Sequence, residues 1–342
     1  MTAAVTDRLP TTGSTSAGPA GDPTRLRVRA LRWEADDVLA VTLDHPGGSP
    51  LPPWRPGAHV DLHLDDRSDA DAVVRSYSLC GRPGLAEWTV AVRLDPASRG
   101  GSRHVHERLR VGQSITVTGP RQLFGLDPAP AYLFVAGGIG ITPLLPMIEE
   151  VVAAGRPWRL LYAGRSLAAM PFRDRLAGHP DRVQVFPAQE GARLDLTAAV
   201  PAALAGLAGE ALVYCCGPER MLTDVAALVP PDRLRCERFR PRPVVPDADT
   251  PDATGDFEVE LGEGGPVLPV PAATPLLDVL LAAGRDVPWS CREGTCGSCE
   301  TGVLAGVPEH RDSVLTPAEQ AAGDVLFPCV SRALTPRLTL DL

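Results

Sequence analysis

The stretch CREGTCGSC, residues 291–299, holds Cys291, Cys296 and Cys299, and after 29 further residues a fourth cysteine, Cys329, follows in FPCVSR. The resulting spacing is C-x4-C-x2-C plus one distant cysteine. Gly294 and Gly297 lie inside the loop, where the lack of side chains lets backbone N–H groups approach the sulfur atoms. The stretch therefore predicts four thiolates that converge on a metal centre.

Two kinds of metal centre use four cysteines. A three-plus-one loop is typical of a plant-type [2Fe–2S] ferredoxin. A structural zinc site is the alternative, but such sites usually present two close pairs of cysteines. The spacing favours the iron–sulfur cluster and predicts a ferredoxin module over nearly all of residues 256–342.

Length and composition set the frame for this module. A chain of 342 residues, 44% hydrophobic and 22% charged, predicts two or three globular domains. The net charge of −9 gives no basic surplus for nucleic acid or anionic membranes. The acidity is concentrated in residues 255–342, with 13 Asp/Glu against 5 Arg. Eight cysteines and no export signal indicate a reducing, cytoplasmic setting.

The chain before the ferredoxin module shows two further patterns of apolar and polar residues. Residues 25–33, 38–43, 58–64, 86–93 and 114–118 alternate apolar and polar side chains, as antiparallel strands do. From about residue 131, apolar strands alternate with helical stretches, as in a parallel α/β sheet. The uncharged residues 128–148 are interrupted by glycines and a proline, so we expect a buried strand, a tight turn and a helix there instead of a membrane span.

Two glycine turns follow strands of the expected parallel sheet. GGIGITP, residues 137–143, follows YLFVA and opens a helix at Thr142–Pro143, where free N–H groups can receive a pyrophosphate. CCGPERML, residues 215–222, is another strand end with a Gly-Pro turn. Because strand ends of one parallel sheet meet at one edge, both turns should face the same dinucleotide. The turn lacks the third glycine of the full Rossmann fingerprint, so by itself it is weak evidence.

The expected barrel contains two more motifs. RSYSL, residues 75–79, alternates an arginine, an aromatic ring and a hydroxyl that could hold an anionic ring system. SRGGSRHVHERL, residues 98–109, is a glycine-rich start of a helix suited to a phosphate. Together they suggest flavin mononucleotide.

In the order RSYSL, GGIGITP, CCGPERML and CREGTCGSC, these motifs resemble the phthalate dioxygenase reductase family, with vanillate demethylase reductases as close relatives, over residues 25–342. The resemblance implies a multidomain chain: an antiparallel β-barrel that binds flavin (24–126), an α/β domain with a parallel sheet that binds NAD (127–239) and a β-grasp ferredoxin domain (256–342). We also expect a disordered tail before the barrel (1–23) and a Pro-rich linker (240–255) between the NAD-binding and ferredoxin domains.

The family's functional residues carry over by position. Arg75, Tyr77 and Ser78 match the strand that binds the flavin ring, and Arg99, Gly101 and Ser102 match the segment that binds its phosphate. The NAD turn matches Gly138, Gly140, Thr142 and Pro143, and the motif beside the nicotinamide matches Cys216 and Gly217. Glu237 and Phe239 match residues near the flavin, and the cluster ligands are Cys291, Cys296, Cys299 and Cys329. Ser78, Cys216 and Glu237 are the expected catalytic group.

Some positions are less certain in role. Cys216 has no evident base beside it, so we expect it to lie beside the nicotinamide or simply to fill the core, and not to act as a nucleophile. Cys80, Cys215 and Cys236 are expected core residues. Arg165 could meet a 2′-phosphate, which leaves NADPH open although the family implies NADH. Gln122 stands where relatives often carry Asn.

The resemblance implies an NADH-dependent oxidoreductase. A hydride carries two electrons and a [2Fe–2S] cluster accepts one, so FMN would mediate between them. The expected acceptor is a Rieske-type aromatic-ring oxygenase or demethylase, with a cytochrome P450 as an alternative and a non-catalytic iron–sulfur redox sensor as a third reading. We expect a monomer, with no nucleic acid or membrane partner.

Overall fold

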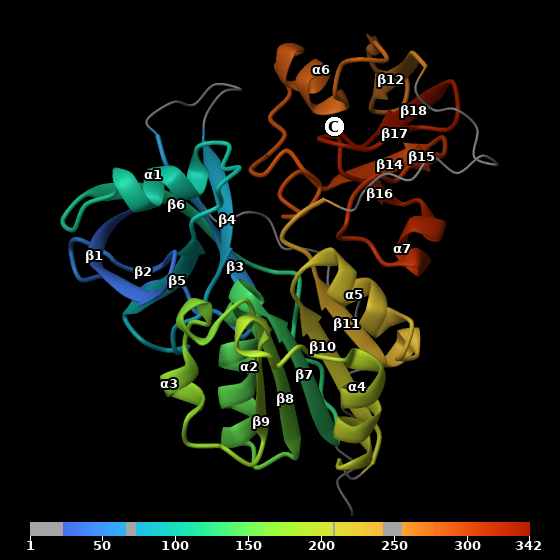
Figure 1. Cartoon of the computed structure of the whole chain (residues 1–342). Helices are drawn as coiled ribbons and strands as arrows, with labels where there is room; N and C mark the ends of the chain where they lie inside the picture. The colour runs from blue at the N-terminus through green and yellow to red at the C-terminus, as the bar shows by residue number, and fades with distance from the viewer. Residues whose placement is uncertain (1–22, 66–72, 208, 242–254) are drawn as a thin grey trace, which may run out of the picture.

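The computed structural model describes residues 23–65, 73–207, 209–241 and 255–342. Most of the expected tail (1–23) and most of the expected linker (240–255) lie outside these ranges. Within them the strands form three main sheets, which Figure 1 shows as three groups around a common junction.

The first sheet is antiparallel and has the strand order β4-β3-β6-β1-β2-β5. A bridge between Leu79 and Val90 joins its two ends, so the sheet closes into the expected barrel. One short helix, α1 (Gly101–Glu107), lies against it. The strands are β1 (Thr24–Ala35), β2 (Val38–Asp44), β3 (Ala58–His63), β4 (Val74–Ser78), β5 (Glu87–Arg93) and β6 (Ser114–Gln122).

The second sheet is parallel and has the order β11-β10-β7-β8-β9. The chain builds outward from β7 on one side and then returns to β10 on the other, which makes the β7–β10 junction a topological switch point. The strands are β7 (Ala131–Gly137), β8 (Trp158–Gly164), β9 (Val183–Pro187), β10 (Ala211–Cys216) and β11 (Leu234–Glu237). Four of them were predicted; β11 was not.

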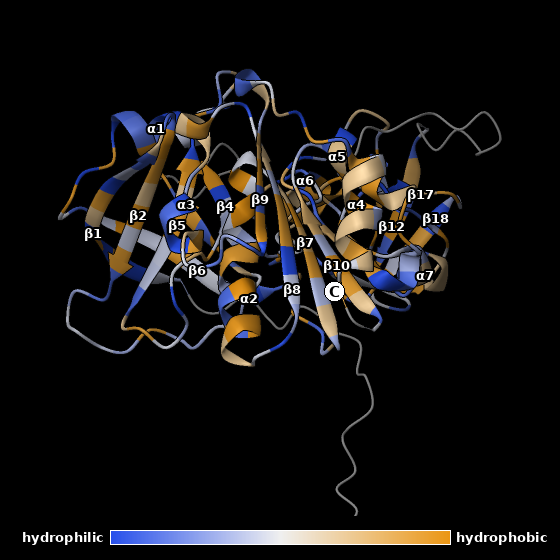
Figure 2. Ribbon diagram, turned by 60° about the horizontal axis from the view of Figure 1, so that its bottom comes forward, coloured by the Kyte–Doolittle hydropathy of each residue, from blue (hydrophilic) through white to orange (hydrophobic). Residues whose placement is uncertain are grey.

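Helices cover both faces of this sheet. Buried side chains of α2 (Ile141–Ala153) and α3 (Arg173–Leu176) share one core cluster, and those of α4 (Leu196–Ala205) and α5 (Glu219–Ala226) share another. Figure 2 shows α2 as largely apolar. Among the described residues, the helices are all too short or too polar to cross a bilayer.

The third sheet is mixed, with the order β13-β12-β18-β14-β16 and one parallel pair, β12 with β18. Together with α6 (Leu276–Ala282) over its core, it has the expected β-grasp arrangement. Its strands are β12 (Phe257–Leu261), β13 (Val267–Val270), β14 (Thr301–Ala305), β16 (Val325–Leu326) and β18 (Arg337–Leu340); a small ladder of β15 (Pro308–Glu309) and β17 (Arg332–Ala333) and the helix α7 (Pro317–Ala322) lie beside it.

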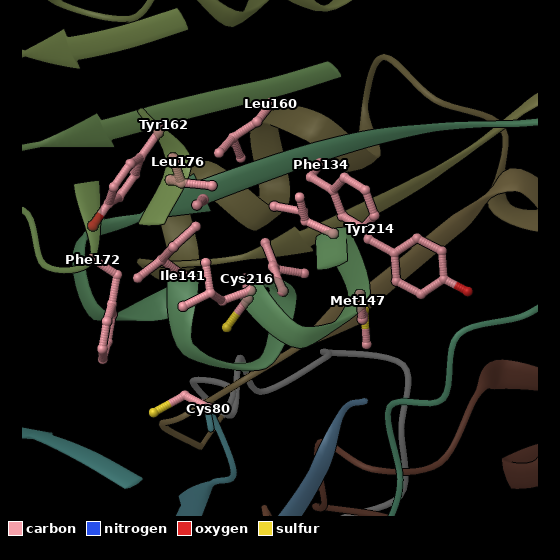
Figure 3. Close-up of a cluster of buried hydrophobic side chains, with 14 of the residues drawn as sticks. Cys80, Phe134, Ile141, Met147, Leu160, Tyr162, Phe172, Leu176, Tyr214 and Cys216 are labelled. Atoms are coloured by element: carbon pink, nitrogen blue, oxygen red, sulfur yellow. The ribbon is translucent and has the colours of Figure 1, made fainter. Parts of the chain in front are cut away.

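The barrel and the parallel sheet share one hydrophobic core. The cluster around Phe134, Ile141 and Tyr162 also contains Cys80 and Phe124 from the barrel section of the chain. Figure 3 shows Cys80 facing this cluster from outside the parallel sheet. As expected, Cys80 and Cys215 are fully buried; Cys236 is half-buried.

The two glycine turns meet at the switch point. Gly140 lies so close to β10 that a Cβ on it would come within 2.2 Å of the Cys216 carbonyl oxygen. A Cβ on Gly137 would come within 2.5 Å of Pro218 Cδ. The expectation that both turns share one edge of the sheet is confirmed. The helix α2 begins at Ile141 after a short 3-10 turn, one residue earlier than predicted.

We expect Gly140→Ala to lower the free energy of unfolding by about 1–3 kcal/mol, because the added methyl group would clash with the backbone of β10 and the two backbone segments would have to shift. Gly178→Ala is the matched control, since no atom lies within 4 Å of a Cβ built there. Thermal unfolding of both variants measures the effect. An equal melting temperature for the two variants would show that the turns are not tightly packed.

Candidate functional site

A cavity of about 390 Å³ lies where the barrel meets the first turn of the parallel sheet. Its walls come from β4, from the start of α1, from the turn after β7 and from the segment after β11. Eight of the predicted residues line it: Arg75, Tyr77, Ser78, Arg99, Gly101, Ser102, Thr142 and Phe239. Its volume suits a ligand of small-molecule size.

Arg75 is fixed against one wall of this cavity. Its Nη1 donates to the Val74 carbonyl at 2.7 Å and its Nη2 to the Arg99 carbonyl at 3.0 Å. A Cβ on Gly101 would lie 2.6 Å from Arg75 Cγ, so only glycine leaves room for this arginine. Burial and the nearby Arg99 lower the pKa of Arg75. Two guanidinium groups at one end of the cavity suit an anion such as a phosphate.

The three expected catalytic residues meet at one corner. Ser78 is buried at the end of β4 and forms a side-chain hydrogen bond with Glu237 at the end of β11. The Cys216 Sγ lies 4.0 Å from Glu237 Oε2. This contact places a carboxyl group beside Cys216, which the sequence did not indicate.

The two titratable groups in this corner, the carboxyl group of Glu237 and the thiol of Cys216, are neutral near pH 7. Burial raises the pKa of Glu237 to about 8, although the hydrogen bond with Ser78 opposes the rise. Burial, and then the carboxyl group of Glu237, raise the pKa of Cys216 well above its usual value. A neutral thiol is a poor nucleophile, in keeping with the expectation that Cys216 does not attack substrate.

The residues of the predicted dinucleotide turn occupy different depths. Thr142 reaches the cavity, and its Oγ1 donates to the Ile139 carbonyl at 2.9 Å. Gly138 and Gly217 are half-buried at the junction of the turns, with Gly138 at a positive φ of 55°. Pro143 is buried within α2.

Arg165 lies apart from the cavity, just beyond the end of β8. Its side chain is 61% exposed, and its Nη2 lies 3.5 Å from a carboxylate oxygen of Asp37. Its guanidinium is therefore engaged with an acidic residue of the barrel.

The four cluster cysteines are all buried in the third domain. The sulfur of Cys291 contacts those of Cys296 and Cys329, and the sulfur of Cys329 also contacts that of Cys299. Backbone N–H groups of Glu293 and Thr295 point at Cys291 Sγ, at 3.3 and 3.5 Å.

The loop geometry explains its glycines. Gly294 and Gly297 have positive φ values of 65° and 71°, a region that favours glycine. Four thiols in contact, with amide donors around them, fit a [2Fe–2S] cluster.

A second cavity, of about 100 Å³, connects the two centres. Ser78, Glu237 and Phe239 line it on the side of the larger cavity, and Cys291 and Cys296 on the side of the cluster. The cluster loop thus rests on the barrel beside the larger cavity.

Sequence reasoning missed His59 and Asp61, two residues of the barrel that contact this loop; Arg99, which also contacts it, was predicted for the flavin phosphate. His59 Nε2 lies 3.2 Å from the Cys296 carbonyl oxygen, and Asp61 accepts a hydrogen bond from Ser298 at 3.4 Å. Arg99 pairs with Glu293 at 2.6 Å. The signal for two of them was the strand AHVDLH, where His59 and Asp61 are polar yet buried.

Comparison with known proteins extends over the same parts of the chain. Residues 261–334 match the 2Fe-2S iron-sulfur cluster binding domain, and residues 134–227 match the oxidoreductase NAD-binding domain. The phenoxybenzoate dioxygenase subunit beta of Ectopseudomonas oleovorans is 43% identical over 333 residues, which cover 96% of this chain and 100% of that protein.

Two solved structures are similar over nearly the whole chain. Phthalate dioxygenase reductase, described as a modular structure for electron transfer from pyridine nucleotides to [2Fe-2S], has a TM-score of 0.65 and 33% identity, covering 94% of this chain and 98% of that one. An intact type IV self-sufficient cytochrome P450 monooxygenase has a TM-score of 0.82 and 43% identity, covering 94% of this chain but 41% of its own.

These matches decide between the readings that the sequence left open. The cluster reading holds over zinc, and the chain is an oxidoreductase, not a non-catalytic sensor. Of the expected cofactors, the matches confirm the [2Fe–2S] cluster and a nicotinamide dinucleotide bound by the NAD-binding domain. The chain belongs to the phthalate dioxygenase reductase-like family, the reductase components of oxygenase systems that pass electrons through a flavin and a [2Fe–2S] cluster.

Proposed function

We propose that this chain is the NADH-dependent reductase of a Rieske-type aromatic-ring oxygenase or demethylase. The observation that carries the proposal is the second cavity, which Glu237 and Ser78 line on one side and two cluster cysteines on the other. Bound FMN would supply the conversion of a two-electron donor into single electrons. The acceptor class rests on similarity to a dioxygenase subunit over that subunit's whole length.

Several of the predicted residues have a task in this proposal. Arg75 and Arg99 hold the flavin phosphate end by charge, while Ser78 donates near the ring. Gly140 and Gly217 let the two turns pack against each other, Gly138 leaves open space where a dinucleotide can approach, and Thr142 closes the cavity beside them. Cys216 fills the space beside the nicotinamide as a neutral thiol.

A cytochrome P450 is the second candidate acceptor. The fused P450 monooxygenase resembles this chain more closely in backbone than phthalate dioxygenase reductase does, with TM-scores of 0.82 and 0.65. Reconstitution with purified Rieske-type oxygenases and with P450s, scored by product formation per NADH consumed, separates the two. We further propose that the reductase acts as a monomer.

An anaerobic titration of the purified protein with NADH tests the core of the proposal. We expect flavin absorbance and cluster absorbance to bleach together, and the flavin extracted from the protein to be FMN. Stopped-flow reduction by NADPH should be slower than reduction by NADH, because the family resemblance implies NADH and Arg165 already lies 3.5 Å from a carboxylate oxygen of Asp37. If neither centre bleaches, the proposed electron transfer is refuted. FAD in the extract would refute FMN as the flavin, and a preference for NADPH would refute NADH as the donor.

The raised pKa of Glu237 predicts a pH dependence. Because its pKa is about 8, the carboxyl group is protonated at pH 7 and ionises as the pH rises through that value. An ionised Glu237 would add a buried negative charge where the incoming hydride already brings one, so the rate of flavin bleaching by NADH should fall. We expect a loss of roughly three- to tenfold between pH 7 and 9.

The variant Glu237→Gln keeps the corner neutral at every pH. Stopped-flow measurement should therefore show a flat rate between pH 7 and 9 for this variant. If the variant retains the slope of the natural protein, another group controls the rate.

The acidic ferredoxin domain predicts a salt dependence of electron delivery. Residues 255–342 hold 13 Asp/Glu against 5 Arg, so a basic surface on the acceptor would steer the encounter. Turnover with the oxygenase should fall several-fold between about 0.01 and 0.15 M ionic strength, as the screening length shrinks from roughly 30 to 8 Å. Reduction of ferricyanide by NADH is the control for effects of salt on the reductase itself. Turnover that does not respond to salt would contradict the proposed steering.

A further inference from the structure

A buried ion pair lies in the barrel wall directly beneath the cluster loop. Arg121 of β6 and Asp61 of β3 are 4% and 1% exposed, and the guanidinium contacts the carboxylate. Burying two opposite charges gains little stability over an apolar pair of similar size. Neither residue lines the 390 Å³ cavity, so flavin binding does not account for them.

Asp61 connects this pair to a cluster ligand. Its Oδ1 accepts from Ser76 at 2.5 Å, and its Oδ2 accepts from Ser298 at 3.4 Å. The Ser298 Oγ lies 3.1 Å from Cys296 Sγ. Ser298 has one hydroxyl proton, so the carboxylate of Asp61 competes with the sulfur of Cys296 for it.

Arg121 brings a positive charge to the same place. Its charge interacts with the sulfurs of Cys296, Cys291 and Cys299, and its Nε is buried without a hydrogen-bond partner among the described residues. The guanidinium is therefore a buried cation beside the cluster loop, unlike Arg99, which pairs with Glu293 of the loop but is 58% exposed.

We propose that Arg121, held in place by Asp61, is a positioning residue that raises the reduction potential of the [2Fe–2S] cluster while the cluster loop rests on the barrel. A cluster that accepts one electron gains one negative charge, and a buried cation stabilises that charged state. Asp61 orients the guanidinium, but its negative charge offsets the effect of Arg121 on the reduction potential. Its carboxylate also accepts the Ser298 hydroxyl proton, which is then not donated to Cys296.

By linkage, the interaction is reciprocal: the reduced cluster holds its loop to the barrel more strongly than the oxidised cluster does. The proposal goes beyond the electron transfer described above and does not depend on which oxygenase accepts the electrons.

Two variants of the full-length protein, with flavin and cluster bound, test the proposal. Arg121→Gln should lower the cluster's midpoint potential, and Asp61→Asn should raise it. Each shift should correspond to a three- to tenfold change in the one-electron reduction equilibrium, where tenfold is about 59 mV. The readout is a redox titration followed by the electron paramagnetic resonance signal of the reduced cluster.

The opposite signs separate electrostatics from structure. Both variants break the same ion pair, so a purely structural role predicts shifts in one direction or none, and either result overturns the proposal. Arg121→Lys keeps the charge and should stay close to the natural potential; if Arg121→Gln fails to fold, Arg121→Lys and Asp61→Asn still decide. Arg27→Gln is the control, since it breaks the partly exposed Arg27–Asp44 pair at 2.7 Å elsewhere on the barrel and should leave the potential unchanged.

Flavin bleaching by NADH, measured on the same preparations, reports the proposed function separately. Its loss in the natural protein would refute that function, whereas the potential shifts concern only the cluster and its barrel contacts.

Discussion

The contact between the cluster loop and the barrel is the constraint on which the rest of the arrangement depends. A Cβ on Gly297 would lie 2.8 Å from Leu123 Cδ1, so the backbone of the loop packs directly against a side chain of the barrel section. The positive φ of Gly297 favours glycine at this contact. This approach lets Ser78, Glu237 and two cluster cysteines line one small cavity. Sites for a two-electron donor and a one-electron acceptor thereby become neighbours.

The two interfaces of the barrel differ in chemistry. Toward the parallel sheet it shares a continuous apolar core that includes Cys80 and Phe124 (Figure 3). Toward the ferredoxin domain its contacts are mainly polar, as with His59 and Asp61, and the ferredoxin domain has a core of its own. Large apolar interfaces hold domains rigidly, whereas polar ones permit relative motion. Hydride transfer, which needs fixed geometry, is thus placed at the rigid interface, and the single-electron carrier at the one that can separate.

Local patterns in the sequence predicted most of the fold and the cluster. The alternation along residues 38–43 and 86–93, the glycine turns and the cysteine spacing each depend on neighbours in the chain, so they can be read without coordinates. The strand β11 was missed because its four residues are too short for a periodic pattern. The role of Arg121 was missed for another reason: the cysteines with which its charge interacts lie 170 or more positions away in the chain. Only the barrel's closure and the seating of the loop bring them together.

The exposed charges at the interface between the ferredoxin domain and the barrel contribute little to its stability. The domain is strongly acidic, and the barrel meets it with Arg99, whose ion pair with Glu293 is 2.6 Å long but whose side chain is 58% exposed. Exposed pairs of this kind contribute about 0–1 kcal/mol. The buried Arg121 is different, because the protein interior screens it less and its effect on the loop changes with each electron that the cluster gains or loses. The interface therefore combines a weak, constant attraction with a stronger one that depends on the redox state, so loss of the electron to an acceptor also weakens the hold of the barrel on the loop.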